Sequence, residues 1–256
     1  MSALASLGMR FASLLAFLGV LLLWEAGCRL FKVPVFVLPA PSAVLGAVGE
    51  IGAARWLEHL MATLNVALAG YAVAIVLAFV LAVAITSSRL LSRILLPWLI
   101  VIQSTPIIAV APIIVVTLGA GNLPRVVITT LIAFFPLVIG IATGLAAVPP
   151  EMLELSRSLR APRSREYLQV RMPFAVPYIF SALKVAITLA VIGAVVAEFV
   201  AAERGLGYLI LFTTSTFKIP TAFASLALLV GSSLTLYGLI VWLQRRWFPW
   251  SITPDA

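Results

Sequence analysis

The sequence predicts an all-α polytopic membrane protein, and three observations support this prediction. Hydrophobic residues make up 63% of the 256 residues and charged residues only 10%, whereas soluble domains are about half apolar and a quarter charged. The mean hydropathy is +1.18. The apolar residues also form long runs, each able to cross a hydrocarbon core of about 30 Å as a helix. We therefore expect a single transmembrane domain over 1–256.

Six spans are predicted, with short loops between them. They lie at about 11–28, 60–85, 94–118, 126–148, 174–200 and 222–243. Pro97, Pro106 and Pro112 predict a kink in the third span, because each proline removes one backbone donor. Small residues at 140–144 in the fourth span favour close helix packing.

The first run has a competing interpretation as a signal peptide, because Arg10 precedes it and Cys28 ends a lipoprotein-like stretch. Glu25 stands where a lipoprotein site needs a leucine-like residue, and the rest of the chain also spans the membrane. The run is therefore predicted to be the first span. Cys28 is the only cysteine, which excludes an intramolecular disulfide and indicates a small buried side chain.

Positive charges predict the orientation of the spans. With the N-terminus inside, ten lysines and arginines fall on the cytoplasmic side and six on the outer side. The loop between the fourth and fifth spans holds five of the ten: Arg157, Arg160, Arg163, Arg165 and Arg171. Both termini and this loop are therefore predicted to be cytoplasmic. The net charge of +8 does not indicate nucleic-acid binding, because the cations flank apolar runs.

The loop at 149–173 has the signals of a short amphipathic helix. Pro150 and Glu151 are typical of a helix start and Pro162 of its end, while Ser164 is predicted to cap a second short turn. The apolar residues of the helix repeat at intervals of three and four: Met152, Leu155 and Leu159. A helix of about ten residues is marginal alone, so it must lie against lipid headgroups, its own bundle or a partner's groove.

Within this loop the run from Glu154 to Ser156, the turn near Arg160 and the closing Pro173 resemble the EAA loop of ABC importer permeases. The resemblance, together with the apolar stripe, predicts these ATPase-coupling residues: Glu154, Leu155, Ser156, Leu159, Arg160, Ala161 and Pro173. Arg160 stands at the family's glycine, although arginine adopts a left-handed backbone less readily. Either Ala161 and Pro162 form the turn instead, or the chain has drifted from the pattern.

Three further stretches resemble the same family and follow in the same order. They lie at 38–42, at 103–119 and at 197–209, where Ala197-Glu198-Phe199 precedes Gly205-Leu206-Gly207. The resemblance indicates the nitrate, sulfonate, taurine and pyrimidine-precursor branch. It implies a substrate that is a small anion or a heteroaromatic nutrient.

The resemblance implies a type I ABC importer permease in a bacterial inner membrane, with a cytoplasmic coupling helix between the fourth and fifth spans. The implied partners are a cytoplasmic ATPase dimer, a second permease copy in a homodimer and an extracytoplasmic solute-binding protein. No cofactor is implied. The chain itself is not the ATPase, because none of its lysines forms the Gly-Lys-Ser or Gly-Lys-Thr of a phosphate-binding loop.

Lys184 and Glu198 lie in or near the fifth span, where charge is costly. Either both line the translocation path, or Lys184 reaches the headgroups and Glu198 the interface. They cannot pair with each other, because fourteen helical residues span about 21 Å. An ion-gradient-driven secondary transporter is the alternative, but few intramembrane carboxylates and no convincing inverted repeat support it. A single His and no metal or nucleophile motif argue against an enzyme.

Overall fold

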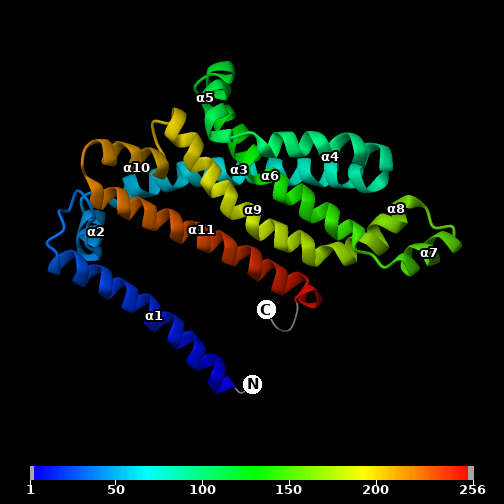
Figure 1. The fold of residues 1–256 in the computed structure, drawn as a ribbon, viewed down its shortest axis with the longest axis horizontal. Helices are drawn as coiled ribbons and strands as arrows, with labels where there is room; N and C mark the ends of the chain where they lie inside the picture. Colours follow the sequence, from blue (N-terminus) through cyan, green and yellow to red (C-terminus); the bar gives the residue numbers. More distant parts are fainter. Residues whose placement is uncertain (1–2, 253–256) are drawn as a thin grey trace.

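The computed structural model describes residues 3–252, and this part of the chain is helical without strands (Figure 1). The predicted domain ends at 1–2 and 253–256 lie outside the described residues. In chain order the helices are α1 (Ala3–Leu30), α2 (Pro41–Val48), α3 (Ala53–Ser87), α4 (Arg89–Ser104), α5 (Ile107–Leu118), α6 (Asn122–Ala146), α7 (Pro150–Ser158), α8 (Arg163–Arg165), α9 (Met172–Ala201), α10 (Leu206–Ser215) and α11 (Ile219–Trp247). A π-helical turn at Glu166–Arg171 joins α8 to α9, and a 3₁₀ turn at Pro249–Ser251 follows α11.

Five of the six predicted spans fall on one helix each, and the third falls on two, α4 and α5. Within the described residues, α3, α6, α11 and the continuous helix Arg163–Ala201 are long and apolar enough to cross a membrane, and α4 with α5 adds one more if counted as a single span. Helix α1 covers the predicted first span. The prediction of an all-α membrane protein is confirmed.

The third predicted span is broken rather than gently kinked. Helices α4 and α5 meet at 94°, on either side of Pro106, which has no N–H to continue the ladder. Hydroxyl groups bond the carbonyls of the preceding turn: Ser104 donates to Ile100 at 2.8 Å and Thr105 to Val101 at 2.9 Å. The sequence signal was right about the place and understated the angle.

Helices α3, α6 and α9 pack together at the centre of the molecule (Figure 1). A Cβ added to Gly140 of α6 would lie 2.5 Å from the Cβ of Ala182 in α9, so the two backbones approach more closely than larger residues permit. The hydroxyl of Tyr71 in α3 donates to the carbonyl of Leu183 in α9 at 3.0 Å. The small residues of the fourth span thus serve packing.

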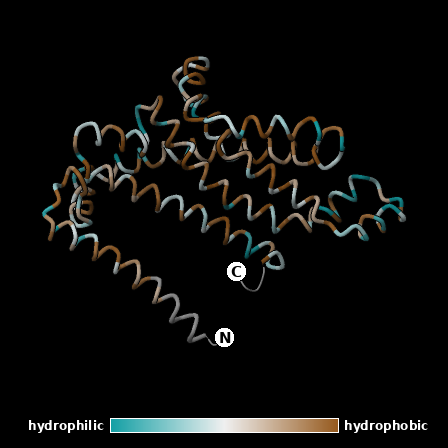
Figure 2. Tube along the Cα trace, viewed as in Figure 1, coloured by the Kyte–Doolittle hydropathy of each residue, from teal (hydrophilic) through white to brown (hydrophobic). Residues whose placement is uncertain are grey.

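Polar segments gather at the two ends of the helix bundle and apolar residues along its length (Figure 2). One end carries α7 and α8, and the other carries α2 and α10 (Figure 1). Helix α1 runs apart from the central helices and packs on α2, with Trp24 5.9 Å from Phe223 of α11. Cys28 is buried, as predicted.

Candidate functional site

Helix α7 forms where the loop signals predict it. It runs from Pro150 to Ser158, with proline in its first turn and Glu151 beside its positive end. Ser156 is buried, whereas the apolar stripe faces outward: Met152 is 40% exposed, Leu155 54% and Leu159 73%. The stripe therefore does not pack against the protein's own bundle, which leaves lipid or a partner as its contact.

The turn after α7 is made by Arg160 itself. Its φ is +52°, in the left-handed region, where glycine is usual at the end of a helix. The N–H of Arg160 donates to Arg157 O at 2.9 Å and that of Ala161 to Ser156 O at 3.0 Å, the bond pair of a Schellman motif. Of the two alternatives that the sequence left open, a turn formed instead by Ala161 and Pro162 is wrong, because the left-handed residue is Arg160.

The segment after this turn is one helix with the fifth span. It begins directly after Pro162, without a side-chain cap, so the predicted cap at Ser164 is wrong. The helix runs unbroken over Arg163–Ala201. Its π turn ends at Arg171, two residues before Pro173, which lacks the N–H that an α-helical bond to Gln169 would need.

Arg171 ties this helix to the rest of the bundle. Its guanidinium forms a 2.7 Å ion pair with Glu166 and donates to the carbonyl of Leu145, at the end of α6, at 3.0 Å. It also lies 5.0 Å from the centre of the Tyr167 ring. The hydroxyl of Tyr167 donates to Thr86 of α3 at 3.2 Å. The loop base is thus fixed to two other spans.

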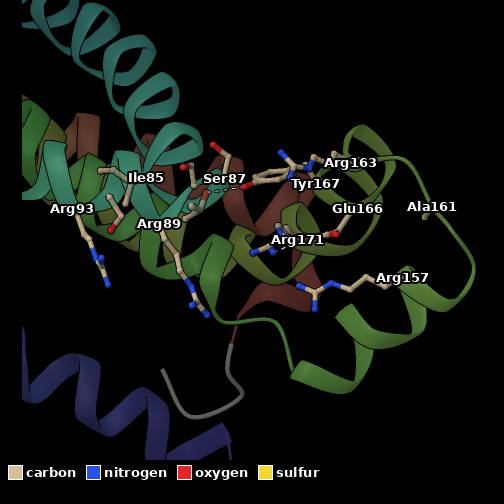
Figure 3. A pocket seen from close by; sticks show the side chains of 13 residues that line it. Ile85, Ser87, Arg89, Arg93, Arg157, Ala161, Arg163, Glu166, Tyr167 and Arg171 are labelled. Carbon is tan, nitrogen blue, oxygen red and sulfur yellow. Dashed lines mark hydrogen bonds and ion pairs between the residues drawn. The ribbon is translucent and has the colours of Figure 1, made fainter.

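A cleft of about 630 Å³ opens between this base, the end of α3 and the start of α4 (Figure 3). Its lining includes one carboxylate, that of Glu166, and five guanidinium groups, those of Arg89, Arg93, Arg157, Arg163 and Arg171. Sequence reasoning counted these arginines for orientation but did not bring Arg89 and Arg93 together with the loop. Their meeting depends on how α3 and α4 turn, which no local pattern reveals.

A second polar cluster lies at the opposite end, at the start of α10. Three successive N–H groups there donate to side chains of α3 and α9: Gly205 to His59 Nδ1 at 3.1 Å, Leu206 to Thr63 Oγ1 at 2.8 Å and Gly207 to Glu198 Oε2 at 2.7 Å. Glu198 is 2% exposed, so it is buried within the protein. A carboxylate is favourable at the positive end of a helix.

Of this cluster, only Glu198 was identifiable from the sequence as a candidate site residue, and its partners were not. The spacing from Glu198 to Gly205 and Gly207 was noticed only as part of a resemblance, and His59 only as a lone histidine. Lys184 is half-buried in α9 and, among the described residues, has no recorded ion pair. No group of three or more His, Cys, Asp or Glu side chains in the described part is arranged to hold a metal ion.

Residues 70–249 match the family described as binding-protein-dependent transport system inner membrane component. The chain is 36% identical to the riboflavin transport system permease protein RibX of Chloroflexus aurantiacus over 90% of this chain and 87% of that protein. It is 30% identical to the formylaminopyrimidine transport permease protein ThiX of Halalkalibacterium halodurans over 92% and 94% respectively.

The fold is also similar to a solved structure, the crystal structure of an amino acid ABC transporter with histidines. The TM-score is 0.65, and the match covers 79% of this chain and 98% of that one. Because the sequence identity is only 19%, this similarity concerns the fold alone.

Proposed function

We propose that α7 couples this chain to an ATPase, because the chain belongs to the binding-protein-dependent transport system inner membrane component family. The family makes the chain a multi-pass membrane protein and the non-catalytic permease subunit of an ABC importer. Its ATPase is a separate subunit, and a solute-binding protein is a further partner. These assignments favour ATP-driven import over the ion-gradient alternative.

The single observation that supports the coupling role is the exposed stripe of α7. Leu155 and Leu159 present apolar side chains to the outside of a helix that is far too short to span a membrane. Apolar anchors surrounded by charged residues are typical of a helix that docks in a protein groove. We propose the exposed Glu154 and Arg160 as the rim of this contact, with Ala161, Pro173 and the buried Ser156 shaping the loop.

The orientation proposed from the charges follows the same reasoning. The end that carries α7 and the arginine cleft is the cytoplasmic end, and the end that carries α10 faces outward. The N- and C-termini are then both cytoplasmic. We further propose that two copies of the chain form a homodimer and that Lys184 of α9 lines the path between them, with Glu198 holding the outer end of the same helix.

We propose a nitrogen heteroaromatic nutrient as the solute. Two relatives at 36% and 30% identity are named for riboflavin and for formylaminopyrimidine, and both compounds contain nitrogen heteroaromatic rings. Taurine and aliphatic sulfonates appear in the names of relatives at 27% and 23% identity. The heteroaromatic class is therefore favoured over nitrate, sulfonates and taurine.

The test reconstitutes the permease with its ATPase and its solute-binding protein in vesicles. We expect ATP-dependent uptake of a heteroaromatic compound that the binding protein retains, and no ATP hydrolysis above background by the permease alone. Uptake that needs no ATP but follows a proton or sodium gradient would contradict the importer assignment. Uptake of taurine or nitrate, with no heteroaromatic compound bound, would contradict only the proposed solute.

A further inference from the structure

The cleft of Figure 3 holds more positive charge than its ion pairs neutralise. Glu166 is already paired with Arg171. Within the described residues, no salt bridge is formed by the other arginines of the cleft: Arg89, Arg93, Arg157 and Arg163. A guanidinium presents a planar fork of donors that matches the oxygens of a phosphoryl group. The lining therefore has the chemistry to bind a phosphate-bearing anion.

Hydroxyl groups add neutral donors on the same walls. Ser87, Ser88 and Ser92 line the cleft where α3 ends and α4 begins, and all three lie close to Arg89 in sequence. Serine hydroxyls and guanidinium groups together are typical partners of phosphate oxygens. The two helices thus supply donors from one wall, and the base of the α7 loop supplies them from the other.

An apolar groove of about 450 Å³ adjoins this cleft. Its apolar lining comes from three elements: Phe79, Val83, Leu145, Leu168 and Met172. The groove and the cleft share Ser87, Arg163 and Tyr167. A free phosphate would occupy the charged cleft and leave the groove empty. A phospholipid would place its phosphodiester in the cleft and an acyl chain in the adjoining groove.

The position of the cleft at the ends of two spans fits such an amphipathic ligand. Its lining runs from Ile85 at the end of the apolar run of α3 to Arg93 in the first turns of α4. Basic residues at the ends of spans lie at the level of the lipid headgroups. We propose that the cleft and groove bind one anionic phospholipid, its phosphate among the arginines and one acyl chain in the groove.

The bound lipid would link two parts of the chain. Arg89 and Arg93 belong to α4, whereas Arg157 belongs to α7 and Arg163 to the helix after it. The four unpaired cations repel one another across the cleft, and an anion between them removes that repulsion. An anionic headgroup would therefore be shared between the cations of α4 and those of the α7 loop.

The test measures binding of short-chain lipids to the full chain purified in detergent. We expect dioctanoyl phosphatidylglycerol to bind at least tenfold more tightly than dioctanoyl phosphatidylcholine, which has the same chains and no net charge. The double variant R89Q/R93Q should weaken phosphatidylglycerol binding by about fivefold per arginine. This factor corresponds to the attraction between one basic side chain and an anionic membrane surface. R89K/R93K keeps the charge and should restore most of the binding.

Two further variants separate this site from general surface charge. R245Q/R246Q removes two exposed arginines from the end of α11, outside the cleft, and should leave the affinity unchanged. Leu168 lines the groove and is 69% exposed. Leu168→Gln should therefore weaken lipid binding but leave the salt dependence of that binding unchanged.

Three results would overturn the proposal. Equal losses in R245Q/R246Q and R89Q/R93Q would mean a diffuse charge effect. Competition by inorganic phosphate at the same concentration as the lipid would mean a site for the free anion. Unchanged lipid binding in R89Q/R93Q, with loss of the co-purified ATPase, would mean that these arginines contact the partner protein.

Discussion

The backbone N–H of Gly207 donates to Oε2 of Glu198 at 2.7 Å, so a carboxylate from α9 caps the first turn of α10. Replacing Glu198 with alanine leaves that N–H buried and unsatisfied, which costs about 1–3 kcal/mol of folding free energy. Glu198→Gln keeps one acceptor oxygen and should cost less. Thermal unfolding in detergent measures both. The exposed Glu203 nearby is the control, and a loss in Glu203→Ala as large as in Glu198→Ala would contradict the capping role.

Gly205 permits the loop to pass directly over this carboxylate. Its φ is +131°, and an added Cβ would collide with the carboxyl group of Glu198. Gly205→Ala should therefore destabilise the protein by several kcal/mol, since backbone strain adds to the steric clash. Gly231 lies in α11 with no neighbour within 4 Å of an added Cβ, so Gly231→Ala should be neutral or stabilising. Equal melting temperatures for the two variants would contradict this account.

Arg160→Gly should stabilise the end of α7. A non-glycine residue in the left-handed region costs about 1–2 kcal/mol, partly offset by the greater freedom of glycine in the unfolded chain. We expect a net gain of up to about 1 kcal/mol, seen as slower hydrogen exchange at Ala161. Arg157→Gly, inside the helix, is the matched control and should speed exchange. Faster exchange in Arg160→Gly and slower exchange in Arg157→Gly would show that the turn is not strained.

Replacing Leu155 or Leu159 with aspartate should release the ATPase. Each removes an exposed apolar anchor, and such residues contribute about 2 kcal/mol or more to an interface. Co-purification of the ATPase and solute uptake in vesicles are the measurements. Ser164→Asp adds the same charge to an exposed site beyond the stripe, and this variant should still co-purify with the ATPase and support solute uptake. If the leucine variants also retain them, α7 is a membrane-surface element.

Labelling of single cysteines tests the orientation. Cys28 is buried and free, so Cys28→Ala provides a background without reactive thiols. A cysteine at the exposed position Ser164 should react with an impermeant reagent only from the cytoplasmic side, and one at the exposed position Ser215 only from outside. The opposite pattern at both positions would invert the proposed topology.

Periodicity and proline placement predicted most of the fold. The six apolar runs, the break at Pro106 and the short helix before Pro162 all depend on local chemistry, which a sequence displays directly. Arg160 was harder, because the family pattern demanded a left-handed residue while the arginine argued against one. The hydrogen bonds from Arg160 and Ala161 back to α7 stabilise the left-handed residue at position 160, and no propensity scale includes these bonds.

The polar clusters could not be predicted, because they join residues that are distant along the chain. His59 and Gly205 are 146 positions apart, and Tyr167 and Thr86 are 81 apart. Such pairings follow from how the long helices pack, so a single sequence shows only that each residue is polar in an apolar region. Glu198 was noticed for its charge, yet its partners became identifiable only with the start of α10 in place.

The close contact of Gly140 with Ala182 limits how the molecule can move. At this seam the Gly140 backbone faces the Ala182 methyl group, which has no rotamer to change and so cannot make room for a shift. We therefore expect helices α6 and α9 to move together. We expect a rearrangement that opens a route for solute to bend the chain where its hydrogen-bond ladder is already interrupted, as at the 94° corner between α4 and α5.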